Sequence, residues 1–143
     1  MAVGQAAEDA LLDIQTRPSI VKLNEAELPV VLEALGLPNA GELESGCRTL
    51  REAFGLALVC LTLGPEGSLL CTASETLGSP GMRVEVADTV GAGDAFTAVL
   101  CHHWLRGATL ARTAKAANRY GAWVASQAGP TPAVPADIAG AVR

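Results

Sequence analysis

The residues best suited to chemistry lie in one glycine-rich run, Asp88–Phe96, which reads DTVGAGDAF. Gly91 and Gly93 let a backbone turn sharply and approach a ligand without obstruction by a Cβ atom. If a helix begins there, the amides of Gly91, Ala92, Gly93 and Asp94 are unpaired donors that can hold an anion. The Asp94 carboxylate repels a resting phosphate, but it can accept a hydroxyl proton while the amides stabilise a phosphoryl group in transfer. These residue types at this spacing would suit phosphoryl transfer.

A structural interpretation of the same run is equally available from these residues alone. An aspartate in the first turn of a helix interacts favourably with the helix dipole, whatever its chemistry. The run matches neither the Walker phosphate-binding loop, GxxxxGK[ST], nor the dinucleotide fingerprint GxGxxG. A bare Gly-Ala-Gly-Asp string would favour the structural role.

Other polar residues also have ordinary structural explanations. Asn24 and Glu27 have the spacing of a capping box, in which the glutamate reaches back to a backbone amide. Thr62 can be a β-branched strand residue. Asn118 and Ser126 can lie on a solvated helix face.

Composition excludes several classes of protein. The chain has 143 residues, of which 50% are hydrophobic. This hydrophobic content excludes a disordered polymer. The formal net charge is −5, which argues against nucleic acid or an anionic membrane as the main partner.

Apolar runs, the first residues and the cysteines indicate in which cellular compartment the protein is found. We expect no membrane span, because no apolar run approaches the roughly 18–20 residues that one requires. We expect no secretory signal, because the first residues lack a basic segment. The four cysteines are widely spaced without a CxxC motif, and the adjacent His102 and His103 cannot chelate one ion together. We therefore expect a reduced, cytoplasmic protein.

Hydrophobic periodicity and turn residues predict an α/β succession. Asn24 is expected to cap a helix, Pro29 to end or kink its first turn, and Gly36 to stop it. Residues 74–81 and 88–93 are expected to be loops, and residues 129–135 a loop followed at most by one helical turn. We expect strands at 19–22, 56–63, 68–72 and 82–86, and helices at 6–15, 30–35, 42–54, 94–105 and 109–127. So few strands make only part of a doubly wound sheet.

Four segments together resemble the PfkB-type, ribokinase-like carbohydrate kinases, in the order that this family has them. They are VKLNEAEL at 21–28, LTLGPEGSLL at 61–70, DTVGAGDAF at 88–96 and ANRYGAWVASQAGPTP at 117–132. The last segment is most similar to the fructokinase-like branch. The resemblance extends from about Ile20 to Pro135. It implies the C-terminal part of a ribokinase-like, Rossmann-like sheet flanked by helices, with residues 1–143 forming one partial domain.

The resemblance also implies roles for individual residues. Asp94 would be the general base, with the amides of Gly91, Ala92 and Gly93 as the anion hole. Asn24 and Glu27 would hold Mg²⁺ and phosphate, through water. The remaining implied positions are Thr62, Gly64 and Gly67 at the ATP phosphates and ribose, Asn118 beside the adenine, and Asp88 with the backbone near Val90 and Ser126 at a monovalent-cation (K⁺) site.

The sequence departs from the family in one large respect. The sugar-contacting residues and lid of the family precede the segments found here, so the acceptor site is not encoded in this chain. We therefore expect ATP and a small sugar as partners of a longer kinase, and an isolated chain that is inactive and self-associates through its uncovered surface. Two alternatives stay open: a non-catalytic nucleotide-binding remnant, and a kinase of the same superfamily that acts on a nucleoside or a sugar acid.

Overall fold

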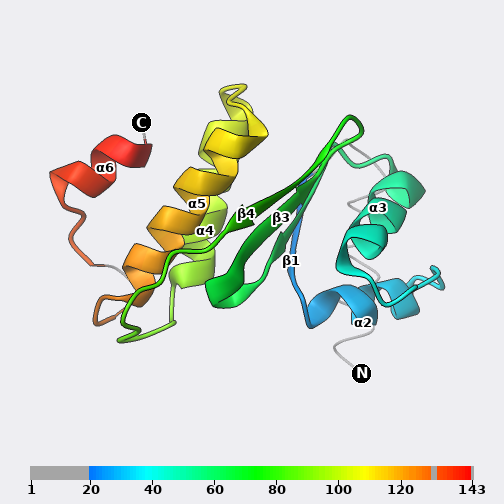
Figure 1. Cartoon of the computed structure of the whole chain (residues 1–143), viewed down its shortest axis with the longest axis horizontal. Coiled ribbons are helices and arrows are strands. Elements are labelled where there is room, and N and C mark those ends of the chain that lie inside the picture. Colours follow the sequence, from blue (N-terminus) through cyan, green and yellow to red (C-terminus); the bar gives the residue numbers. More distant parts are fainter. Residues whose placement is uncertain (1–19, 130–131, 143) are drawn as a thin grey trace. The chain divides into compact units, whose positions relative to one another are not determined.

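The computed structural model describes residues 20–129 and 132–142 and has an α/β fold, a mixed four-stranded sheet flanked by helices (Figure 1). The expected helix at 6–15 lies outside the described residues. The strands are β1 (Ile20–Asn24), β2 (Leu58–Thr62), β3 (Gly67–Cys71) and β4 (Thr76–Pro80), the helices are α2 (Glu27–Ala34), α3 (Leu43–Phe54), α4 (Ala92–Leu105), α5 (Leu110–Ala125) and α6 (Ala136–Val142), and the short 3-10 helix η1 (Gly64–Glu66) connects β2 to β3.

The strands are hydrogen-bonded in the order β1-β2-β3-β4. β1 and β2 are parallel, and their register pairs Ile20 with Leu58 and Asn24 with Thr62. This register places Asn24 and Thr62 side by side where both strands end. The described chain forms two compact units, one made of residues 20–62 and 69–76 and the other of residues 63–68 and those from 77 onward.

The first unit is built around β2, whose apolar run predicts a strand covered on both faces. Leu58, Val59, Cys60 and Leu61 are fully buried. Helices α2 and α3 pack against β1, β2 and each other, and α3 presents Cys47 and Leu50 to this core. Burial, together with the neighbouring Cys71 and Glu44, raises the pKa of the Cys47 thiol to about 12.

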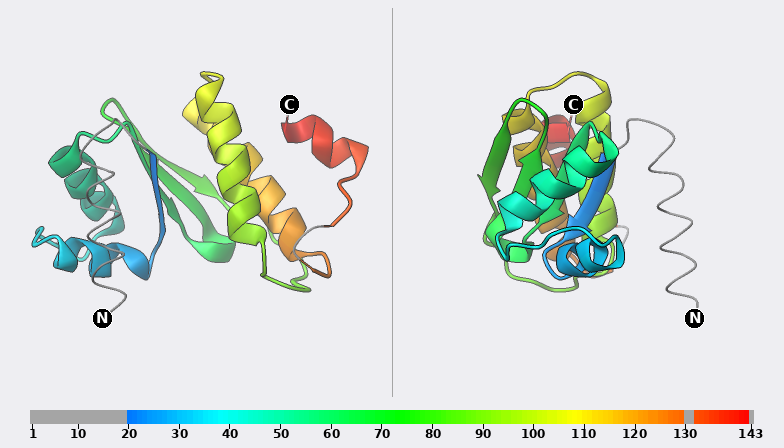
Figure 2. Two further views of the ribbon diagram at one scale, coloured as in Figure 1. Left: turned by 180° about the vertical axis from the view of Figure 1, so that it is seen from behind. Right: turned by 90° about the vertical axis from the view of Figure 1, so that its right-hand side faces the viewer.

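The second unit contains the antiparallel pair α4 and α5, which lie side by side in both views of Figure 2. One face of α5 carries mainly small residues and lies inward, because Ala114, Ala117 and Val124 are buried. A Cβ atom on Gly121 would lie 3.3 Å from the carbonyl oxygen of Ala92 and from Cβ of Phe96. Gly121 therefore allows α5 to approach the first turn of α4 closely.

The structure corrects two expectations about the elements. The strand expected at 82–86 is wrong, and the strand forms instead at Thr76–Pro80, within the segment expected to be a loop. The reason is local: Thr72 N–H donates to the Glu75 carbonyl at 2.9 Å and closes a tight turn, which returns the chain beside β3. Pro29 neither ends nor kinks its helix, because it is the third residue of α2. The first N–H groups of a helix have no partner inside it, so a proline there removes no helical bond.

The other elements fall close to the predicted positions. α3 and α5 match the predicted helices within two residues at each end, while α4 begins at Ala92, two residues before the predicted start. Helix α6 follows residues 132–135 and has seven residues, so it is longer than the single turn expected. Within the described part of the chain, no helix has both the length and the apolar character that a membrane crossing requires.

Candidate active site

The glycine-rich run forms a turn that leads into α4. Gly91 caps the helix with φ of 84°, a left-handed conformation that disfavours residues with a side chain. Ala92 N–H donates to the Thr89 carbonyl at 3.2 Å, and the Gly91 carbonyl accepts the first helical bond, from Ala95 N–H at 2.9 Å. Among the residues that the structure describes, no acceptor is found for the amides of Gly91, Gly93 and Asp94.

Asp94 lies in the first turn of α4 and is exposed. Its carboxylate has no hydrogen-bond or ion-pair partner among the described residues, so neither of its oxygens is engaged by them. The adjacent helix turn is held by Thr97, whose hydroxyl donates to the Gly93 carbonyl at 2.8 Å. The turn thus combines unpaired amides with an accessible carboxylate, which is the arrangement that phosphoryl transfer needs.

The loop before this turn is tied to the end of α5. Ala87 and Asp88 both donate their N–H groups to the Ala125 carbonyl, at 2.9 and 3.1 Å. Asp88 Oδ1 accepts from Val90 N–H at 2.9 Å. Ser126 follows Ala125, and its hydroxyl donates to the Trp123 carbonyl at 2.7 Å. The structure therefore brings Asp88 and the backbone next to Ser126 together.

A second turn of the same unit has backbone segments in direct contact. Gly67 has φ of 113°, and a Cβ atom there would overlap the Ser79 carbonyl. A Cβ atom on Gly81 would overlap the Pro65 carbonyl, while Gly81 N–H donates to the Glu66 carbonyl at 3.0 Å. Gly64 has φ of 55° and open space where a Cβ would lie, so its backbone is accessible to a ligand.

Asn118 holds the end of β4. Its Nδ2 atom lies 3.3 Å from the Ser79 carbonyl, 3.2 Å from the Ser79 hydroxyl and 3.4 Å from the Pro80 carbonyl. Through these contacts, Nδ2 of the buried Asn118 supports the backbone at the end of β4. The amide oxygen of Asn118 stays available to other partners. Sequence reasoning missed Gly81 and Ser79, and only the Gly-Pro and Pro-Gly pairs at 64–65 and 80–81 signal two turns there.

The first unit holds the remaining predicted residues. Glu27 N–H donates to Asn24 Oδ1, and Asn24 N–H donates to Glu27 Oε2, each at 2.8 Å. These reciprocal bonds have the pattern of a capping box, but Asn24 does not cap α2 as expected, because it ends β1 and the N-cap of α2 is Ala26, which makes no side-chain capping bond. Thr62 Oγ1 donates to the Leu23 carbonyl at 3.3 Å, and the Thr62 carbonyl accepts from Glu25 N–H at 3.2 Å. The structure thus gathers Asn24, Glu27 and Thr62 at one end of β1 and β2.

The residues present fit the groups that the resemblance implies. Unpaired amides at a left-handed glycine suit the phosphates of a nucleotide. Glu27 is exposed and has one carboxylate oxygen outside the capping bonds, a hard donor of the kind that hydrated Mg²⁺ accepts. Asp88 and nearby carbonyls are oxygen donors suited to a monovalent cation. The described residues contain no cluster of three or more His, Cys, Asp or Glu side chains that could bind a metal by themselves.

The chain matches a family model of carbohydrate kinases and curated relatives that are named as kinases. The family model described as pfkB family carbohydrate kinase matches residues 2–137. The chain is 33% identical over 138 residues to a 1-phosphofructokinase of Rhodobacter capsulatus, covering 92% of this chain and 41% of that protein. It is 29% identical over 100 residues to a deoxyribokinase of Salmonella typhi, covering 70% of this chain and 32% of that protein. The chain therefore spans less than half the length of these curated relatives.

Solved structures share the fold over the same fraction. An adenosine kinase from Sinorhizobium meliloti superposes with a TM-score of 0.77 at 25% identity, covering 92% of this chain and 38% of that one. A putative ribokinase II from E. coli, in complex with ATP and Mg²⁺, gives 0.72 at 24% identity, covering 86% and 38%. Phosphofructokinase-2 from Escherichia coli, in complex with potassium, gives 0.69 at 19% identity, covering 78% and 36%.

Proposed function

Because the chain belongs to the pfkB family of carbohydrate kinases, we propose that it carries the ATP-binding and catalytic part of a cytoplasmic, fructokinase-like kinase that phosphorylates a sugar hydroxyl. One observation carries this proposal: the turn at Gly91 combines amides that lack an acceptor with the accessible carboxylate of Asp94. Anion-stabilising donors and a proton acceptor are the two functions that phosphoryl transfer to a hydroxyl requires.

In this proposal each described residue has a stated role. Asp94 accepts the proton of the attacking hydroxyl, and the amides of Gly91, Ala92 and Gly93 stabilise charge on the transferred group. The Ala92 amide, which donates to Thr89 at 3.2 Å, takes this role only if that long bond opens. The nucleotide is bound by Thr62, Gly64, Gly67, Asn118 and Ser126.

Two sets of residues are proposed to hold metal ions. Asn24 and Glu27 hold Mg²⁺ through water, and Asp88 with the Val90 carbonyl holds K⁺. Mg²⁺, when bound, neutralises charge on the nucleotide phosphates. Glu27 keeps its capping bond to Asn24 and offers its second oxygen. The names of relatives support these ions, since one solved neighbour is a complex with ATP and Mg²⁺ and another a complex with potassium.

The acceptor is proposed at the level of a sugar or sugar derivative. Two relatives are named 1-phosphofructokinase, which favours a fructose-type acceptor, while others are named deoxyribokinase and aminoimidazole riboside kinase. We propose that the residues that bind the acceptor lie in the part of the relatives that this chain does not cover. A second candidate is a nucleotide-binding module without turnover, because the amides at Gly91 that lack an acceptor suit a phosphate whether or not Asp94 accepts a proton.

The test joins this chain to the part of the Rhodobacter capsulatus 1-phosphofructokinase that it does not cover. ADP formation by this joined protein is measured with and without fructose 1-phosphate, beside the 143-residue chain alone. We expect acceptor-dependent ADP formation by the joined protein, and from the chain alone at most slow ATP hydrolysis together with self-association on gel filtration. A folded joined protein that binds ATP without acceptor-dependent turnover would support the second candidate instead.

A further inference from the structure

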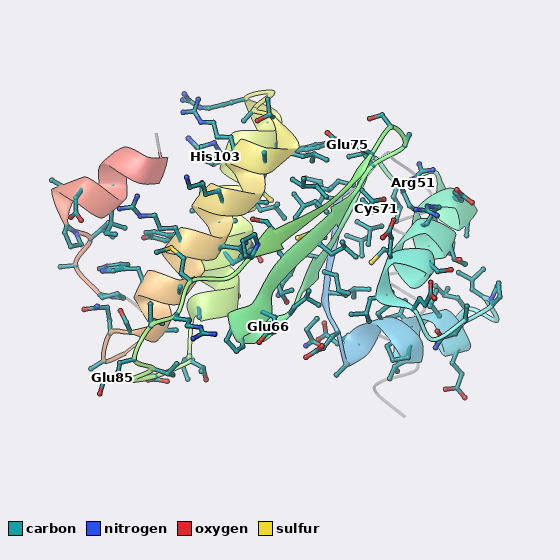
Figure 3. The ribbon with its side chains drawn as sticks, viewed as in Figure 1. Arg51, Glu66, Cys71, Glu75, Glu85 and His103 are labelled. Carbon is teal, nitrogen blue, oxygen red and sulfur yellow. The ribbon has the colours of Figure 1, made fainter. Side chains whose placement is uncertain are left out.

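The first unit contains a pocket of about 250 Å³ that the proposed kinase does not use. It lies between α3 and the turn that connects β3 to β4, and Figure 3 shows Arg51 and Glu75 on these two elements. Asn24 and Thr62 lie at the opposite end of β1 and β2, since the turn after β3 adjoins the beginning of β2. The pocket lining is polar and consists of Glu44, Arg48, Arg51, Glu52 and Thr72–Thr76.

Arg51 is the residue of this lining with the poorest set of partners. Its side chain is 15% exposed. One terminal nitrogen lies 3.5 Å from the Leu56 carbonyl and the other 3.8 Å from Glu52 Oε1. Both distances are longer than the roughly 2.7–2.9 Å that is typical of charged hydrogen bonds. Among the residues that the structure describes, none is a hydrogen-bond partner of the buried Nε of Arg51. A largely buried cation held this loosely has capacity for a further anionic partner.

The rest of the lining restricts the charge of that partner. Arg48 and Glu44 neutralise each other through a 2.8 Å ion pair. This leaves one cation, Arg51, against two exposed carboxylates, Glu52 and Glu75. A doubly charged phosphate would be repelled by both carboxylates, whereas a molecule with one negative and one positive group matches the charges on both sides.

Hydroxyl groups complete the pocket. Thr76 Oγ1 contacts Cys71 Sγ at 3.5 Å, and sulfur is a weak acceptor. Ser74 Oγ lies 3.3 Å from Thr72 Oγ1. We propose that this pocket binds a small α-amino acid, whose carboxylate contacts the guanidinium of Arg51 and whose ammonium group faces Glu52 and Glu75. A volume below that of drug-sized sites suits a ligand of this size.

The test is a ¹⁵N NMR titration of the 143-residue chain, repeated on the joined protein, with glycine, alanine and serine. Acetate, methylamine and inorganic phosphate serve as separate probes of each charge. We expect an amino acid to shift the amides of residues 72–76 and to bind about tenfold or more tightly than acetate or methylamine. Equal or tighter binding of phosphate, or no shift of these amides by any amino acid, would overturn the proposal.

Substitutions test which pocket residue contacts the carboxylate of the amino acid and which faces its ammonium group. Arg51→Met is expected to weaken amino-acid binding about 10- to 100-fold, because a hydrogen-bonded charge is lost. Arg83→Met, which removes an exposed arginine of the second unit, is the matched control and should change nothing. Glu75→Gln should weaken binding of alanine but not of acetate, and this readout remains if Arg51→Met fails to fold. Equal effects of Glu75→Gln on alanine and acetate would contradict the assigned orientation.

Discussion

At the residue scale, Glu27 can act in two ways, by its capping bond to Asn24 or by holding Mg²⁺. One substitution distinguishes these two roles. Glu27→Gln keeps an oxygen that accepts from Asn24 N–H. The free energy of unfolding should therefore stay within about 0.5 kcal/mol of its original value. The substitution removes a negative charge, so the joined protein should need more Mg²⁺ for half-maximal rate. Urea unfolding and a Mg²⁺ titration measure the two effects. A loss of stability with unchanged Mg²⁺ dependence would show that capping is the whole role.

Gly91 gives a second test at this scale. Its φ of 84° disfavours a side chain, and it lies in the turn whose amides are proposed to hold phosphate. Gly91→Val should cost about 1–2 kcal/mol of backbone strain and also lower ATP affinity, measured by calorimetry on the joined protein. Gly107→Val is the matched control, since Gly107 has φ of 69° and open space around it but follows the far end of α4. If both variants lower ATP affinity equally, Gly91 acts only through stability.

At the scale of elements, the contact between the turn at 64–67 and the end of β4 is the feature that sequence reasoning missed. Gly81→Ala places a Cβ atom against the Pro65 carbonyl, so the backbone must shift. We expect a loss of about 1–3 kcal/mol in the free energy of unfolding and weaker ATP binding. Gly78→Ala, within β4 and with open space where its Cβ would lie, should change neither. Denaturant unfolding and ATP calorimetry of both variants check this, and an unaffected Gly81→Ala would contradict it.

Helix α3 leads to a prediction about alkaline pH. The pKa of Cys47 is about 12 in the folded chain against an ordinary value of 9.0, so the unfolded chain loses the proton first. This thiol therefore contributes stability that is present below pH 9 and is lost as the pH rises from 9 toward 12. The loss amounts to at most about 1.4 kcal/mol per pH unit. Cys47→Ala should flatten the pH dependence of unfolding in that range. An unchanged slope would contradict the burial argument.

Sequence patterns predict α3, α4, α5 and the first three strands, because each has a clear apolar period or a bounded apolar run. They failed at β4, where Thr76–Pro80 has little apolar pattern and pairs only because the turn at 72–75 returns it to β3. The alternation in 82–86 was misleading for the same reason, since hydrogen bonding in three dimensions decides which segment becomes the strand. The resemblance singles out Asn118 but gives no sign of its contacts to Ser79 and Pro80, which are 39 and 38 residues away along the chain.

At the scale of the whole molecule, catalysis depends on more than the residues that carry it. The chain covers 41% of the Rhodobacter capsulatus relative. Positioning of the acceptor supplies much of the rate in phosphoryl transfer. Without a bound sugar, water is the only molecule from which the Asp94 carboxylate could accept a proton. The role of Asp94 must therefore be measured in the joined protein.

The most direct measurement compares the joined protein with its Asp94→Asn variant. Asparagine keeps the size and much of the hydrogen bonding of aspartate but cannot accept the proton. We expect kcat to fall about 10²- to 10⁴-fold while the Kd for ATP stays within about twofold. A variant with kcat within a few-fold of the unsubstituted joined protein would contradict the assignment of Asp94 as the base, and with it the proposed catalytic role of this chain.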